Sequence, residues 1–143
     1  MPGMSGSLPS IEEAKEAFAF LDDWEDRYRY IMDLGEKLPA MCETDRVEAN
    51  LVHGCQSLVW VAMHQADGRV VLGADSDSSL VKGLAALVVL AIKGLAPTDV
   101  VGFDLDGFFR ELNLHDHLSP TRSNGLHGMV RQVRARAVEM VAH

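Results

Sequence analysis

The sequence predicts an α+β fold in which helices pack on a small antiparallel sheet. Three observations support this class. Apolar residues recur at helical spacing over residues 11–38 and again over residues 80–92. Residues 57–64 alternate with a period of two, and Asp67-Gly68 beyond them is a hairpin signal. Because no internal repeat and no linker is visible, we expect one domain over residues 10–143, preceded by a flexible tail over residues 1–9.

The stretch before residue 40 predicts two helices. Ser10 and Glu13 have the spacing of a capping box, so the first helix is expected to begin there. Asp22 or Asp23 can cap the second helix, which Pro39 ends. The apolar faces of the two helices carry Ile11, Ala14, Phe18 and Leu21, and then Trp24, Tyr28, Ile31 and Leu38.

A hairpin is expected in the middle of the chain. Residues 41–54 show no clear period and predict an irregular connection. From Ser57 onward both alternating faces are largely apolar, which predicts a strand covered on both sides. Ala66-Asp67-Gly68 turns the chain, and residues 69–72 are expected to form the return strand.

The second half of the chain predicts helices. The run Asp75-Ser76-Asp77 is expected to cap a central helix whose apolar residues extend from Leu80 to Ile92. Gly94 and Pro97 end that helix. One or two short helices are expected within residues 99–114, and Ser119-Pro120 is expected to break the chain before a final helix. The apolar residues of the final helix are Leu126, Met129, Val130, Val133 and Val141.

Charge and composition exclude several classes of function. The chain has 143 residues, 48% of them hydrophobic, and a net charge of −8, so we expect a packed globule with little affinity for a phosphate backbone. Its one basic cluster, Arg131, Arg134 and Arg136, is typical of a solvated helix face. The longest apolar run has nine residues, whereas a membrane span needs roughly 20. We therefore expect neither nucleic acid nor membrane as a partner.

The cysteines and histidines lead to expectations about the cellular compartment and about metal binding. Cys42 and Cys55 are too few for a disulfide framework, and the first ten residues lack the basic and apolar regions of a secretory signal. These features favour the reducing cytoplasm. The only close histidine pair is His115-Asp116-His117, and structural zinc usually needs four clustered ligands, so no metal is expected. Asp75 and Asp77 also suggest a cation site, although helix capping explains them better.

Cys55 is the candidate for chemistry. It follows Gly54 at the junction between an irregular segment and a strand, where a thiol can meet the sulfur of another protein. The reactive form is the thiolate, which a nearby cation favours, and His53 and Arg122 are candidates for that cation. The residues alone leave open that Cys55 is a small buried hydrophobe. Cys42 has no comparable setting, and we expect it to be incidental.

Four stretches of this chain resemble the SufE family of sulfur acceptors. The segment Asn50–Trp60, which contains Val52-His53-Gly54-Cys55-Gln56-Ser57, is similar to the central motif of that family. Three further stretches fit in the same order along the chain. They are Trp24–Pro39, Asp75–Leu84 and Leu118–Leu126.

This resemblance implies a function and an acceptor residue. Family members take sulfur from a pyridoxal-phosphate cysteine desulfurase of the SufS type, stimulate that enzyme, and deliver the persulfide toward an iron–sulfur cluster scaffold. By motif position the acceptor is Cys55. Arg122 lies in a family motif and either supports the thiolate or has a helix-start or packing role. The pyridoxal phosphate belongs to the partner, so no cofactor is expected in this chain. The implied fold is shared with IscU-type scaffolds, which bind zinc or a cluster through three cysteines, and this chain has only two.

Other functions remain open at this point. The chain could be a binding module that activates a desulfurase without accepting sulfur, or an acceptor for a related desulfurase outside the main cluster pathway. A standalone cysteine hydrolase is disfavoured because no acid–histidine spacing accompanies Cys55, and His53 is given no catalytic role. We therefore expect a sulfur-transfer accessory protein rather than a standalone enzyme.

Overall fold

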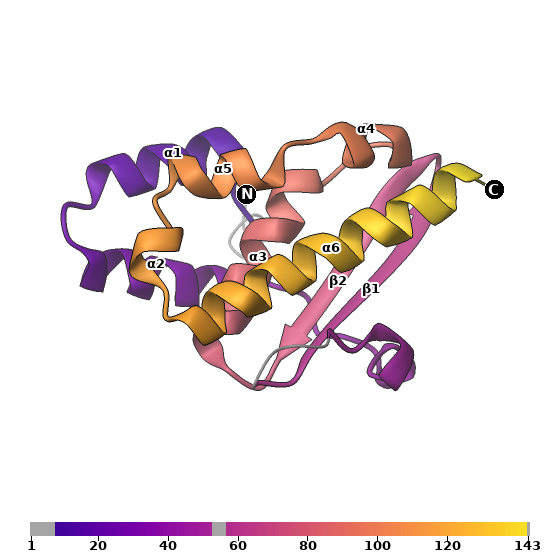
Figure 1. Cartoon of the computed structure of the whole chain (residues 1–143), viewed down its shortest axis with the longest axis horizontal. Helices are drawn as coiled ribbons and strands as arrows, with labels where there is room; N and C mark the ends of the chain where they lie inside the picture. The colour runs from indigo at the N-terminus through magenta and orange to yellow at the C-terminus, as the bar shows by residue number, and fades with distance from the viewer. Residues whose placement is uncertain (1–7, 53–56, 143) are drawn as a thin grey trace, which may run out of the picture.

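A computed structural model describes residues 8–52 and 57–142, and it confirms the α+β class (Figure 1). In these ranges the chain forms six α-helices and one two-stranded antiparallel sheet. The helices are α1 (Ile11–Phe20), α2 (Trp24–Glu36), α3 (Ser79–Ile92), α4 (Pro97–Gly102), α5 (Leu105–Glu111) and α6 (Pro120–Ala142). The strands are β1 (Val59–Ala66) and β2 (Arg69–Ser76), and short 3-10 turns are η2 (Glu43–Asp45), η3 (Glu48–Asn50) and η4 (His115–His117).

The predicted helix starts at the N-terminal end are confirmed. The Ser10 side chain accepts a hydrogen bond from the Glu13 backbone N–H at 3.1 Å, and the Glu13 side chain accepts from the Ser10 backbone N–H at 2.9 Å. Of the two candidates for the cap of α2, Asp23 makes the bond, to the backbone N–H of Asp26. Leu8, at the end of the predicted tail, packs partly buried against the core.

The hairpin turn is the predicted one, but the return strand is longer than predicted. Asp67 and Gly68 both have positive φ, 54° and 75°, which suits a two-residue hairpin turn. The strands pair from Ala66 with Arg69 to Val59 with Ser76, so β2 continues past residue 72. The predicted cap at Asp75-Ser76-Asp77 is therefore wrong: Asp75 and Ser76 lie in β2, and Ser78 caps α3 by accepting from the backbone N–H of Val81 at 3.3 Å.

Helix α3 is central, as predicted. It is buried from Gly83 to Ile92 and packs against α2, β2 and α6. Strand β1 is buried on both faces only in its first half, because His64 and the two residues after it are exposed. Figure 1 shows α6 running across the hairpin. Pro120 occupies the first position of α6, where its missing N–H costs nothing, so this proline begins the helix and does not precede it.

Glycines allow α2 and α3 to approach closely. A Cβ atom at Gly35 would lie 2.8 Å from the backbone nitrogen of Gly83. A Cβ atom at Gly83 would collide with the carbonyl oxygen of Ile31. Both obstacles are backbone atoms, which cannot rotate away, so the contact between the two helices depends on these glycines.

The described helices include none that is both long enough and apolar enough to cross a membrane.

The close contact predicts that Gly83→Ala destabilises the fold. The added methyl group must push α2 from α3, and overpacking of this kind costs about 1–3 kcal/mol. Urea unfolding followed by circular dichroism measures the loss. Gly102→Ala in α4 is the matched control, because a Cβ atom there meets nothing within 4 Å. Equal stability of the Gly83→Ala variant and the wild type would contradict the proposed role of this contact.

Candidate functional site

The predicted acceptor Cys55 and its neighbour His53 lie outside the described residues. The site is therefore built from the residues on both sides of that gap. On the N-terminal side, the backbone N–H of Val52 donates to the carbonyl of Val59 at 2.8 Å. Leu51 forms an isolated antiparallel bridge with Trp60. The chain entering the gap is thus paired with β1.

Asp77 holds the chain that leaves the gap. Its carboxylate accepts a hydrogen bond from the backbone N–H of Leu58 at 3.1 Å, and its own N–H donates to the carbonyl of Leu58 at 3.2 Å. Leu58 itself is 48% exposed. Asp77 therefore fixes the start of β1, a role that the capping prediction did not include.

A buried carboxylate lies close to the residues that flank the 53–56 gap. Asp75 is 9% exposed, and its Oδ2 accepts from Arg46 Nε at 3.0 Å and from Nη2 at 2.5 Å. Its Oδ1 accepts from the backbone N–H of Ser76 at 2.8 Å and lies 3.5 Å from the ammonium of Lys82. We name these three charged residues the Arg46–Asp75–Lys82 cluster. It joins the segment that bears η2 and η3 to β2 and α3.

The ionisation of Asp75 reflects these partners. Burial disfavours the charged form and raises the pKa of the carboxyl, but hydrogen bonds from Arg46 and Ser76 and the charge of Lys82 outweigh it. The pKa of Asp75 is consequently below its usual range. The hydrogen bond to Asp75 raises the pKa of Arg46 in turn.

The carboxylates of Asp75 and Asp77 already have partners in the described residues. Arg46 and Lys82 lie against Asp75, and Asp77 accepts a backbone N–H. No three His, Cys, Asp or Glu side chains in the described ranges lie close enough to hold an ion. The His117 ring stacks on Trp24 with 3.9 Å between ring centroids, so packing accounts for it.

Arg122 is exposed in the first turn of α6. Its backbone N–H donates to Ser119 Oγ at 3.3 Å, which fits the helix-start role. Its side chain makes no hydrogen bond or ion pair with another described residue. Its support of a thiolate remains a prediction. Cys42 is an exposed free cysteine directly before η2.

Two residues of α6 that were not predicted as site residues hold η3. Arg136 donates through Nη2 to the carbonyl of Ala49 at 2.6 Å and through Nη1 to Asn50 Oδ1 at 3.3 Å. Gln132 donates to the carbonyl of Asn50 at 3.1 Å. The predicted solvated face fits Arg131, which is exposed, but not Arg136. The available signal was the spacing of four residues between 132 and 136, which places both side chains on one face of a helix.

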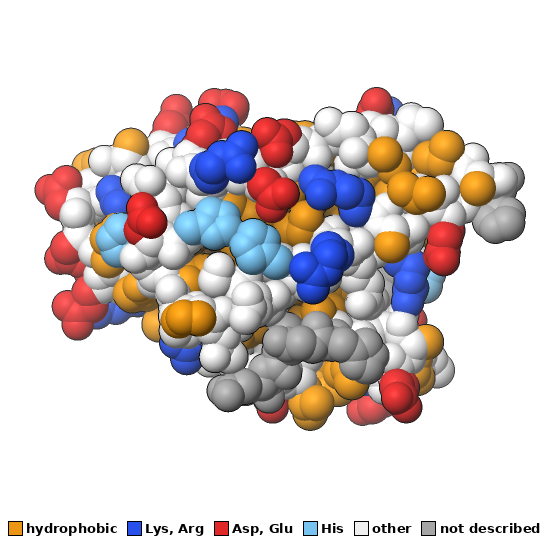
Figure 2. Space-filling view, viewed as in Figure 1, with side chains coloured by type: hydrophobic (Ala, Val, Ile, Leu, Met, Phe, Trp, Pro, Cys, Tyr) orange, Lys and Arg blue, Asp and Glu red, His pale blue; other side chains and the backbone are white. Residues whose placement is uncertain are grey.

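The surface has further features away from the residues that flank the 53–56 gap. Figure 2 shows acidic side chains over α1 and α2, and an apolar patch where α4 meets the end of α6. The patch contains Val101, Val138 and Val141, so Val141 differs from the other apolar residues named for the final helix, which are buried.

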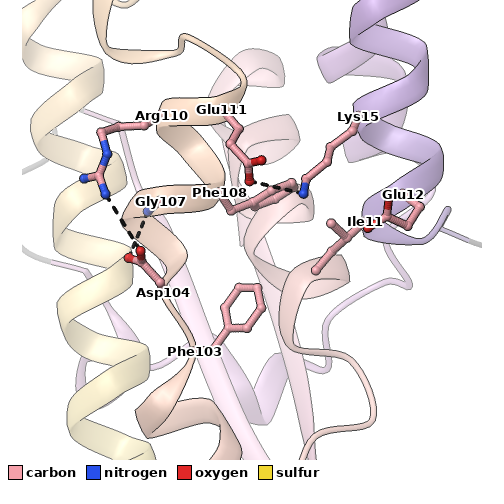
Figure 3. A pocket seen from close by; sticks show the side chains of 9 residues that line it. All are labelled: Ile11, Glu12, Lys15, Phe103, Asp104, Gly107, Phe108, Arg110 and Glu111. Atoms are coloured by element: carbon pink, nitrogen blue, oxygen red, sulfur yellow. Dashed lines mark hydrogen bonds and ion pairs between the residues drawn. The ribbon is translucent and has the colours of Figure 1, made fainter.

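An open groove of about 690 Å³ lies between α1 and α5. In Figure 3 Lys15 of α1 points toward Glu111 of α5, and their charged atoms are 3.1 Å apart. Arg110 and Asp104 form a second pair at 3.7 Å. No residue of η3, β1 or β2 lines the groove, so we assign it no part in the candidate site.

Comparisons with known proteins agree with the motifs. A family model described as "SufE: Fe-S metabolism associated domain" matches residues 12–137. The solution structure of a hypothetical protein from Thermus thermophilus is similar over 96% of this chain and 100% of its own length, with 25% sequence identity and a TM-score of 0.78. The family model lies within residues 10–143, the range predicted to be one domain, and that boundary stays a prediction.

The Arg46–Asp75–Lys82 cluster predicts that Asp75→Asn destabilises the protein in a pH-dependent way. At pH 7 the loss of a charged, hydrogen-bonded carboxylate is expected to cost about 1–3 kcal/mol. The folded-state pKa of Asp75 is lowered, so the stability it contributes is present above the unfolded pKa of about 3.9 and is lost as pH falls through the folded pKa. The difference between wild type and variant should therefore shrink below about pH 4.

Urea unfolding at several pH values measures this difference. Asp33→Asn is the control, because Asp33 lies on α2 and bonds to no other described side chain. If wild type and Asp75→Asn lose stability in parallel as the solution is acidified, the ionised Asp75 does not stabilise the fold.

Proposed function

This chain belongs to the SufE family of proteins associated with Fe–S metabolism, and from that premise we propose that it accepts a sulfur atom as a persulfide on Cys55. The donor is a cysteine desulfurase of the SufS type, and the recipient is an iron–sulfur cluster scaffold. The observation that carries the proposal is the family match over residues 12–137 together with the central motif around Cys55.

The proposed step is a sulfur exchange without net oxidation. The Cys55 thiolate attacks the outer sulfur of a persulfide on the desulfurase cysteine. The bond between the two donor sulfurs breaks as a new sulfur–sulfur bond forms on Cys55. The desulfurase cysteine leaves as a thiolate and is ready for the next turnover, which is how an acceptor stimulates the enzyme.

The described flanks support a site at this position. Val52 is bonded to β1, and Leu58 is bonded twice to Asp77, so the chain on both sides of residues 53–56 is attached to rigid elements. Reactive groups carried on such a frame are placed more reproducibly than groups on an unattached loop. Leu58, exposed beside the same segment, offers apolar surface to a docking protein.

Cys55→Ser tests the proposal against the module that activates without accepting sulfur. With the partner desulfurase, cysteine and a mild reductant, sulfide release should fall to the rate without acceptor. The matched control is Cys42→Ser, which removes the other, exposed thiol and should leave stimulation intact. Without reductant, intact mass should show an added sulfur of about 32 Da on wild type and on Cys42→Ser only.

Stimulation that survives unchanged in Cys55→Ser would show that no sulfur passes through Cys55. The activating module would then be the correct function.

The support of the Cys55 thiolate by Arg122 has a separate test. A nearby cation lowers the pKa of a thiol, so Arg122→Gln should move the midpoint of Cys55 alkylation to higher pH. Iodoacetamide labelling of the Cys42→Ser protein, followed across pH, isolates Cys55. Arg131→Gln on the exposed face of α6 controls for the lost charge. An unmoved midpoint in Arg122→Gln would leave Arg122 with its helix-start role alone.

A further inference from the structure

We infer that Arg136 and Gln132 of α6 are positioning residues for sulfur acceptance: they fix η3 and thereby the chain that leads to Cys55. The inference rests on the proposed function, since it assigns these residues to the same site. Neither is expected to touch the sulfur, because their described contacts are all with Ala49 and Asn50.

Asn50 is the centre of the contact. Its backbone N–H donates to the carbonyl of Val47 at 3.0 Å, and its side-chain Nδ2 donates to the carbonyl of Asp45 at 2.8 Å. Its carbonyl and its Oδ1 accept from Gln132 and Arg136 respectively. Asn50 thus makes hydrogen bonds through its backbone and through both polar atoms of its side chain. Side chains of α6 donate half of these hydrogen bonds.

The two donors of Arg136 suit this contact. A guanidinium is planar and directs several N–H groups in a fixed fork, so one side chain bonds both the Ala49 carbonyl and Asn50 Oδ1. A lysine at the same place has a single nitrogen and can replace only part of the contact. Both hydrogen bonds therefore need the two donor nitrogens of a guanidinium, and a positive charge alone does not replace them.

The contact lies two residues from the gap that contains Cys55. Asn50 is followed by Leu51 and Val52, which pair with Trp60 and Val59 of β1. Gln132 and Arg136 of α6 donate to the carbonyls of Asn50 and Ala49, directly before that pairing. Loss of the α6 donors removes the restraint on one side of η3, while the bonds of Leu51 and Val52 remain on the other. A displacement of about 1 Å at a reacting group can slow a reaction by two orders of magnitude.

Single-turnover transfer from a persulfide-loaded desulfurase tests the inference. With rising acceptor concentration, Arg136→Met should lower the limiting transfer rate about tenfold and leave the half-saturating concentration unchanged. Arg136→Lys should recover part of the rate. Arg131→Met is the matched control, with the same charge change on an exposed part of α6, and should transfer like the wild type. Gln132→Ala removes one hydrogen bond and serves as a milder second variant if Arg136→Met folds poorly.

Amide hydrogen exchange gives a readout that does not require sulfur transfer. The N–H groups of Asn50 and Val52 should exchange faster in Arg136→Met and Gln132→Ala than in wild type and Arg131→Met. If wild type gains no sulfur, the proposed function fails. The exchange rates still test whether Gln132 and Arg136 hold η3. If wild type transfers normally and Arg136→Met transfers at the same limiting rate, the inference is wrong. A change confined to the half-saturating concentration would also overturn it, because Arg136 would then act in docking.

Discussion

The buried carboxylate of Asp75 is the interaction on which the rest of the candidate site depends. It is placed opposite Trp60 in the hairpin and is neutralised by Arg46 from one side and Lys82 from another. A charge with so little access to water is tolerated only because of these partners. The pairing draws three parts of the chain together: the segment with η2 and η3, the end of β2, and the first turn of α3. The residues that flank 53–56 are attached to the first two of these parts, the segment with η2 and η3 and the end of β2.

A second set of hydrogen bonds holds the same region of the chain. Helix α6 crosses the hairpin and reaches η3 through Gln132 and Arg136, while Asp77 secures Leu58. The polar side chains of this region therefore bond to backbone groups of irregular chain, where carbonyls and N–H groups lack partners from a helix or sheet. These bonds hold the described segment with η2 and η3 against a sheet of only two described strands.

Sequence reasoning succeeded where the determinants are local. The capping box at Ser10, the Asp67-Gly68 turn and the apolar circumference of α3 each depend on residues a few positions apart. It failed at Asp75 because five consecutive polar residues, Asp75 to Ser79, offer several equivalent caps, and only the pairing of β2 with β1 decides among them. Arg136 could not be assigned either, since its partners lie 86 and 87 residues away in sequence. The prediction that Cys55 is the acceptor depends on the family resemblance and not on local spacing.

The hairpin turn has a practical consequence. Asp67 and Gly68 are exposed, and a Cβ atom at Gly68 would meet nothing within 4 Å. The turn lies at the far end of β1 from Leu58, roughly 30 Å away at the rise of an extended strand. A short tag or fluorophore grafted into this tip would therefore report on encounters with other proteins without disturbing the end of the hairpin next to Leu58.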